Sequence, residues 1–132
     1  MATLRILVAD DNPLVRSGVR LLLETHNDWI VCGEAANGNE AIKEAVALKP
    51  DVILLDLSMP ELDGLTAIPL IHQRVPDAEI IVVTMHESLV MARLAADREI
   101  TAYITKSLLT TELIPVIESL QDCAISEQAE VK

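Results

Sequence analysis

The sequence predicts an α/β domain with a doubly wound, five-stranded parallel sheet, and two observations lead to this fold class. Short β-branched, aliphatic runs alternate along the chain with segments that have helical spacing. The runs are apolar throughout rather than alternating, as strands covered by helices on both faces require. Alternating strands and helices with right-handed crossovers are typical of doubly wound domains.

Five apolar runs are the predicted strands. Each is short and bounded by polar or turn-forming residues, which suits a buried strand better than a helix. They are Ile6–Val8, Ile30–Val31, Val52–Leu55, Ile80–Val83 and Ala102–Ile104.

Helices are predicted between these strands, and the first two have clear start signals. Asn12 is a suitable N-cap for a helix with Pro13 at its first position. Asn37 caps the second helix, which ends before Pro50. The predicted inward face of the first helix consists of Leu14, Val15, Gly18, Val19, Leu22 and Leu23.

The remaining helices are predicted over residues 66–74, 88–96 and from about Thr111 onwards. Pro69 is placed in the first turn of its helix, where a missing N–H is tolerated, and Pro115 is expected to bend the first turn of the last helix. The pattern fades after about Ile125. We therefore expect one domain over residues 1–125, with 126–132 as a frayed tail or the start of a linker.

Composition limits the possible functions. The 132 residues are 51% hydrophobic, which is typical of a globular domain, and Trp29 and Tyr103 are the aromatic residues, so the core must be aliphatic. The net charge of −11, without a cluster of Lys or Arg, argues against direct contact with nucleic acid or an anionic membrane. Cys32 and Cys123 form no paired motif, and no signal peptide is evident. These features favour a cytoplasmic protein.

Polar residues follow four of the predicted strands. They are Asp10 with Asp11, then Asp56, Thr84 and Lys106. Because the carboxyl ends of parallel strands share one edge of a sheet, we expect these side chains to converge there. An isolated residue of this kind is often only a helix cap or turn residue. Together, however, three carboxylates favour a hard cation such as Mg²⁺, and a lysine and a hydroxyl beside them suit a phosphoryl group.

At these residues the sequence resembles the receiver domains of two-component response regulators, from about Leu4 to Leu120. The strongest match is the stretch DVILLDLSMPELDGL, from Asp51 to Leu65, and VADD, VVTMH and YITKS complete it. Thr84-Met85-His86 and the pair Lys106-Ser107 are most similar to the NarL/FixJ group, whose members carry a LuxR-type DNA-binding effector. The resemblance implies a flavodoxin-like (βα)5 receiver fold with strand order 2-1-3-4-5.

The resemblance also implies a role for each site residue. Asp56 is the expected phosphoacceptor, with Lys106 and Thr84 contacting the phosphoryl group. Thr84 and Tyr103 are the expected switch residues. The expected Mg²⁺ ligands are Asp10 (through water), Asp11, Asp56 and the backbone carbonyl of Ser58.

The implied function is that of a signalling phosphoacceptor rather than an enzyme acting on a separate substrate, with self-catalysed transfer and autodephosphorylation. Its implied partners are a sensor histidine kinase, a second copy on activation, and DNA only through an effector domain absent from this chain. Three alternatives remain: an aspartyl phosphatase, a degenerate receiver that acts only by protein interaction, and an FMN carrier. The phosphatase would need a DxD pair and the carrier a Ser/Thr/Gly-rich loop, where this chain has Asp10-Asp11-Asn12-Pro13.

Overall fold

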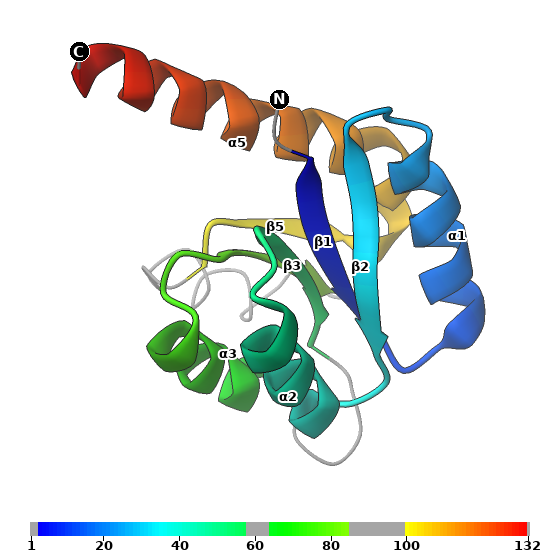
Figure 1. Cartoon of the computed structure of the whole chain (residues 1–132). Helices are drawn as coiled ribbons and strands as arrows, with labels where there is room; N and C mark the ends of the chain where they lie inside the picture. The colour runs from blue at the N-terminus through cyan, green and yellow to red at the C-terminus, as the bar shows by residue number, and fades with distance from the viewer. Residues whose placement is uncertain (1–2, 58–63, 85–99, 132) are drawn as a thin grey trace.

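A five-stranded parallel sheet forms the centre of the molecule (Figure 1). The computed structural model describes residues 3–57, 64–84 and 100–131, except for the side chains of 64–65 and 122–131. In chain order the elements are β1 (Leu4–Ala9), α1 (Pro13–Glu24), β2 (Trp29–Ala35), α2 (Gly38–Leu48), β3 (Val52–Asp56), α3 (Gly64–Arg74), β4 (Glu79–Thr84), β5 (Ala102–Thr105), the 3₁₀ turn η1 (Lys106–Leu108) and α5 (Leu109–Val131).

The strand order is β2-β1-β3-β4-β5, as the family resemblance implied, and every neighbouring pair is parallel. In this order β1 and β3 lie side by side near the centre, with β4 and β5 following. The carboxyl ends of these four strands therefore form one continuous edge. That edge is the lower one in Figure 1.

Alternate residues of the strands supply two separate apolar layers. Leu7, Ile53 and Ile80 face α2 and α3, whereas Ile6, Leu54 and Ile81 face α1 and α5. Both layers are almost fully buried, and their residues are aliphatic except for Trp29. Trp29 is buried in the layer under α1 and α5. Two-sided burial explains why the strand sequences show no alternation of polar and apolar residues.

The helix caps agree with the sequence prediction. The Asn12 side chain accepts a hydrogen bond from the Leu14 N–H at 2.9 Å, and Pro13 is the first residue of α1. The Asn37 side chain accepts one from the Glu40 N–H at 2.8 Å. These caps fix where each helix leaves the edge of the sheet.

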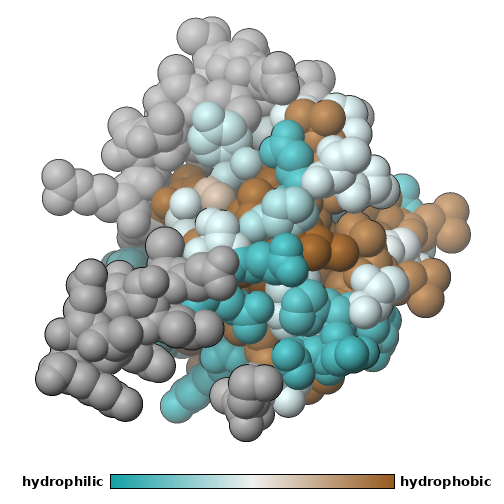
Figure 2. Space-filling model, turned by 90° about the horizontal axis from the view of Figure 1, so that it is seen from above, coloured by the Kyte–Doolittle hydropathy of each residue, from teal (hydrophilic) through white to brown (hydrophobic). Residues whose placement is uncertain are grey.

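Leu14 and Gly18 were wrongly assigned to the inward face of α1, since both are exposed. The face that packs on the sheet consists of Val15, Val19, Leu22 and Leu23, which follow one stripe of the helix. Leu14 and Leu21 lie on a neighbouring stripe and are 81% and 72% exposed. Figure 2 shows apolar side chains at the surface on the side where α1 lies. The prediction had merged two adjacent stripes.

Two prolines lie deeper in their helices than predicted. Helix α3 begins at Gly64 rather than 66, so Pro69 falls inside it and not in its first turn. Helix α5 begins at Leu109 rather than Thr111, which places Pro115 beyond its first turn. Helix α5 also continues to Val131, through the segment predicted as a tail or linker. The predicted helix 88–96 lies outside the described residues.

An aromatic stack joins the α1–β2 turn to α5. His26 is half-buried and stacks on Trp29 with ring centroids 3.9 Å apart. The Trp29 indole N–H donates to the side chain of Gln121 on α5 at 3.0 Å. Buried tryptophan N–H groups usually find such a partner. Within the described part of the chain, no helix has the length and apolar character needed to cross a membrane.

The packing of α5 on the sheet gives a stability prediction. Leu113 of α5 is fully buried, so Leu113→Ala should lower the free energy of unfolding by about 2–5 kcal/mol. Leu14→Ala removes the same atoms from an exposed site and should change it by less than about 0.5 kcal/mol. Urea unfolding of both variants measures the difference. Equal effects would contradict the assignment of these two faces.

Candidate functional site

The carboxyl edge of the sheet brings the predicted polar residues together. Asp10 and Asp11 follow β1, Asp56 is the last residue of β3 and Thr84 the last of β4. Lys106 follows β5 directly and is the first residue of η1. Since β1, β3, β4 and β5 are consecutive neighbours in the sheet, these side chains gather within one short stretch of its edge.

Three carboxylates form the centre of this site. Each of Asp10, Asp11 and Asp56 places a carboxylate oxygen within 4.8 Å of the other two. Asp10 and Asp56 are 4% and 1% exposed, while Asp11 is exposed to solvent. Two of the three negative charges are thus held away from water, an arrangement that is costly without a compensating cation.

Lys106 supplies part of that compensation. Its ammonium nitrogen lies 3.1 Å from Asp56 Oδ2 and 3.3 Å from Asp10 Oδ2. Burial by itself lowers the pKa of Lys106, but the hydrogen bonds and negative charges of Asp56 and Asp10 outweigh it and raise the pKa above its usual value. The lysine is therefore cationic at neutral pH, beside the most buried carboxylate of the site.

Asp10 has its own supports. Its side chain accepts a hydrogen bond from the Asn12 N–H at 2.9 Å, and its backbone N–H donates to the Ala35 carbonyl at 2.9 Å. Burial raises the pKa of the Asp10 carboxyl, and the charge of Asp56 adds to this against the lowering effects of the Asn12 N–H and Lys106. Burial is therefore the main reason that the charged form of Asp10 is disfavoured.

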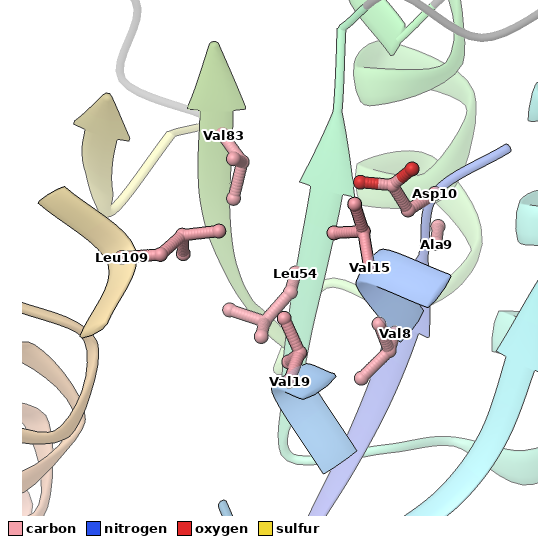
Figure 3. Close-up of a pocket in the computed structure, with 8 residues that line it drawn as sticks. All are labelled: Val8, Ala9, Asp10, Val15, Val19, Leu54, Val83 and Leu109. Carbon is pink, nitrogen blue, oxygen red and sulfur yellow. The ribbon is translucent and has the colours of Figure 1, made fainter. Parts of the chain in front are cut away.

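An apolar floor explains this burial. A small cavity of about 10 Å³ lies beneath Asp10, and its other walls are aliphatic. In Figure 3 these side chains come from β1, α1, β3, β4 and α5: Val8, Ala9, Val15, Val19, Leu54, Val83 and Leu109. A space of this size without polar partners does not favour a water molecule. The side of Asp10 that faces the core is therefore apolar.

The predicted switch residues lie on the last two strands. Thr84 is 4% exposed and pairs with Thr105 of β5. Tyr103 pairs with Val82, is 41% exposed, and precedes the buried Ile104, so their side chains lie on opposite faces of β5. Thr84 thus lies at the site, whereas Tyr103 lies partly at the surface on a strand that leads to Lys106.

The donor set suits a hard divalent cation. Carboxylate oxygens are the ligands that Mg²⁺ prefers in proteins, where it commonly binds one or two carboxylates and keeps several waters. Three carboxylates within 4.8 Å, one of them exposed, provide both the charge and an open side for water. Asp10, Asp11 and Asp56 are the described residues that would hold the ion. The fourth predicted ligand, the Ser58 carbonyl, lies outside the described residues.

One part of the site was not anticipated from the sequence. Arg16 of α1 donates from Nη1 to the backbone carbonyl of Asp10 at 2.6 Å, and its Nε donates to Glu34 of β2 at 2.9 Å. Arg16 lies one helical turn after the N-cap, on the side of α1 that faces β2. The position of Arg16 one turn after the N-cap was the signal that the sequence offered. It identifies Glu34 as a partner only once the order of the strands is known.

Such a fold and site define a class of protein: a doubly wound domain with an acidic, lysine-containing cluster at the carboxyl edge of its sheet. The model of the response regulator receiver domain matches residues 6–118, which is most of the chain. The chain therefore belongs to the response regulator receiver domain family, and it is the receiver domain of a response regulator in a two-component system.

Individual relatives agree with this assignment. The chain is 47% identical over 83 residues to the uncharacterized transcriptional regulatory protein YhcZ of Bacillus subtilis, covering 63% of this chain and 39% of that protein. It is 37% identical over 105 residues to the response regulator protein VraR of Staphylococcus aureus, covering 80% and 50%. The chain spans about half the length, or less, of these two relatives.

Solved structures give the same result. A LuxR family two-component response regulator from Aurantimonas matches with a TM-score of 0.82 and 35% identity, over 90% of this chain and 85% of that one. The RcsB response regulator of Salmonella typhimurium matches with a TM-score of 0.85 and 31% identity, over 92% and 61%. The neighbours thus include the LuxR-type group to which the sequence motifs were most similar.

The crowded carboxylates predict a stabilising effect of Mg²⁺. An ion that binds only the folded chain should stabilise it by about 2.7 kcal/mol at a hundredfold excess over its dissociation constant. Asp11→Asn should remove most of this gain, because it removes the exposed carboxylate of the cluster. Thermal unfolding with and without MgCl₂ measures both.

Asp28→Asn is the matched control, since Asp28 is an exposed acid in the α1–β2 turn. It should keep the Mg²⁺-dependent rise in melting temperature. A similar loss in both variants would mean that Mg²⁺ acts through net charge and not through this site.

Proposed function

We propose that this domain accepts a phosphoryl group on Asp56 from a sensor histidine kinase, in a Mg²⁺-dependent reaction. One observation carries the proposal: the buried Asp56 carboxylate lies 3.1 Å from Lys106, within 4.8 Å of two further carboxylates. A nucleophile, a fixed cation and a set of cation ligands are the groups that phosphoryl transfer to an aspartate needs.

The transfer is a substitution at phosphorus. A carboxylate oxygen of Asp56 attacks the phosphorus of the kinase's phosphohistidine, and a P–O bond forms as the P–N bond breaks. The bonding electron pair remains with the imidazole nitrogen. Mg²⁺, held by Asp10, Asp11 and Asp56, would supply charge neutralisation for the phosphoryl oxygens. Hydrolysis of the resulting acyl phosphate by water releases inorganic phosphate and restores Asp56. The domain can thus end its own signal by autodephosphorylation.

Lys106 and Thr84 report the modification. The phosphoryl group brings about −1.5 to −2 charges and strong acceptor oxygens to the end of β3. Lys106 exchanges its contacts with Asp10 and Asp56 for the phosphoryl oxygens, and the Thr84 hydroxyl donates to the same group. Both residues border β5, so their shift changes the environment of the half-exposed Tyr103. We treat this as a shift between two existing conformations.

The output of the switch is proposed to be transcription. The matches cover only 39% and 50% of YhcZ and VraR, which are named as a transcriptional regulatory protein and a response regulator. Residues 1–125 would act as the receiver and 126–132 as the start of a linker to a DNA-binding effector outside this chain. Phosphorylation would favour a homodimer, which suits a two-fold DNA site. With a histidine kinase and DNA as its partners, the protein would act in the cytoplasm.

Intact mass spectrometry with acetyl phosphate tests the proposal. The wild-type chain should gain one phosphoryl group in the presence of Mg²⁺ and none after chelation. Asp56→Asn should gain none under either condition, because an amide is not a nucleophile at phosphorus.

Asp77→Asn is the control, since Asp77 is an exposed acid at the opposite edge of the sheet. It should be phosphorylated at the wild-type rate. Phosphorylation of Asp56→Asn to the wild-type extent would contradict the assignment of the nucleophile.

A further inference from the structure

Arg16 contacts the backbone of the site rather than its carboxylate side chains. Its Nη1 donates to the backbone carbonyl of Asp10 at 2.6 Å, and this carbonyl belongs to the peptide that joins Asp10 to Asp11. The orientation of that peptide fixes the direction in which both side chains leave the backbone. A group that holds the peptide therefore controls two of the three carboxylates of the cluster.

The Asp10 peptide has other supports, but none replaces this one. The Asp10 N–H is fixed by the Ala35 carbonyl, and the Asp10 side chain is fixed by the Asn12 N–H. These bonds hold the preceding peptide and the carboxylate itself. The carbonyl of the peptide between Asp10 and Asp11 accepts its hydrogen bond from Arg16.

Glu34 aims the guanidinium. Its Oε1 accepts from Arg16 Nε at 2.9 Å, and Glu34 lies on β2 in register with Val8 of β1. The Arg16 side chain is only 18% exposed. A guanidinium can donate to a carboxylate and a carbonyl at once because its donors form a rigid fork, whereas an ammonium is a single flexible point.

Arg20 makes a useful comparison. It donates to the other oxygen of Glu34 at 2.9 Å and lies 3.6 Å from Glu24, but it is 47% exposed. Arg20 contacts those two acids, and among the described residues it makes no hydrogen bond or ion pair with Asp10. Arg16 and Arg20 thus share a partner, a helix and a charge, and differ in the bond to the site.

We propose that Arg16, aimed by Glu34, is a positioning residue that sets the geometry of Asp10 and Asp11 for binding the divalent cation. The inference rests on the proposed function, in which that cation supports phosphoryl transfer to Asp56. Loss of such an outer support typically weakens metal binding by 10- to 100-fold. Arg16→Lys keeps the charge and loses the forked set of N–H donors. The affinity of this variant for the divalent cation should therefore fall by about tenfold, towards the lower end of that range.

The sign of the effect separates positioning from simple electrostatics. Arg16 is a cation near three carboxylates, so removing its charge alone would make divalent cation binding tighter. Loss of positioning makes binding weaker. Arg16→Ala removes both, and the proposal requires weaker binding in spite of the lost positive charge.

The test is a titration with Mn²⁺ in place of Mg²⁺, followed by the electron paramagnetic resonance signal of the free ion, without any phosphodonor. Arg16→Lys, Arg16→Ala and Glu34→Gln should bind Mn²⁺ at least severalfold more weakly than wild type, whereas Arg20→Lys should bind like wild type. In the Arg16 variants, a higher Mg²⁺ concentration should be needed for half-maximal labelling by acetyl phosphate. The labelling rate should return to that of the wild type at saturating Mg²⁺. Urea midpoints identify any variant that is not folded, and Arg16→Lys, which keeps the charge and most of the side-chain length, decides the inference if Arg16→Ala does not fold.

Two results would overturn the inference. The first is an unchanged or tighter Mn²⁺ affinity in folded Arg16 variants. The second is an equal loss in Arg20→Lys, which would show that charge around Glu34 matters and the bond to Asp10 does not. A wild-type chain that binds Mn²⁺ but takes no phosphoryl group would instead overturn the proposed function and leave the positioning role in metal binding intact.

Discussion

The crowding of three carboxylates at the carboxyl edge of the sheet is the constraint on which the rest of the site depends. Asp10 and Asp56 are nearly buried, and Lys106 lies within 3.3 Å of both. Lys106 is one positive charge beside three carboxylates, and burial raises the pKa of Asp10. The remaining imbalance favours a divalent cation and, with it, a phosphoryl group. The crowded carboxylates are thus the feature of this edge that suits a divalent cation.

The two-layered core keeps these charges where they are. Fully buried aliphatic residues on both faces of the sheet fix the strands, and the apolar floor beneath Asp10 prevents water from solvating the carboxylates from below. At the backbone level, Asn12 and Arg16 hold the turn between β1 and α1. In the proposed mechanism, a change in charge at Asp56 would therefore act mainly on Lys106 and Thr84, the side chains that border β5.

Much of this could be predicted from the sequence, because parallel strands bring their carboxyl ends together whatever lies between them. The convergence of Asp10, Asp11, Asp56 and Lys106 followed from that rule, whereas the strands followed from the apolar runs and the first two caps from Asn12 and Asn37. The exposure of Leu14 could not be predicted, because the apolar face of a helix is wide. Two neighbouring stripes of apolar residues can both fall within that width, and the sequence does not say which one packs on the sheet. The Arg16 contact and the His26–Trp29 stack were also beyond reach, because each joins segments whose proximity depends on packing that local patterns do not encode.

The central claim is that a phosphoryl group enters at Asp56, and chemical trapping of the acyl phosphate tests it most directly. Borohydride reduces an aspartyl phosphate to homoserine, which marks the modified residue permanently for peptide mapping. After reaction with acetyl phosphate and Mg²⁺, we predict homoserine at position 56 and unmodified aspartate at positions 10 and 11. Homoserine at position 10 or 11, with aspartate retained at 56, would contradict the account by showing that another carboxylate of the cluster is the nucleophile.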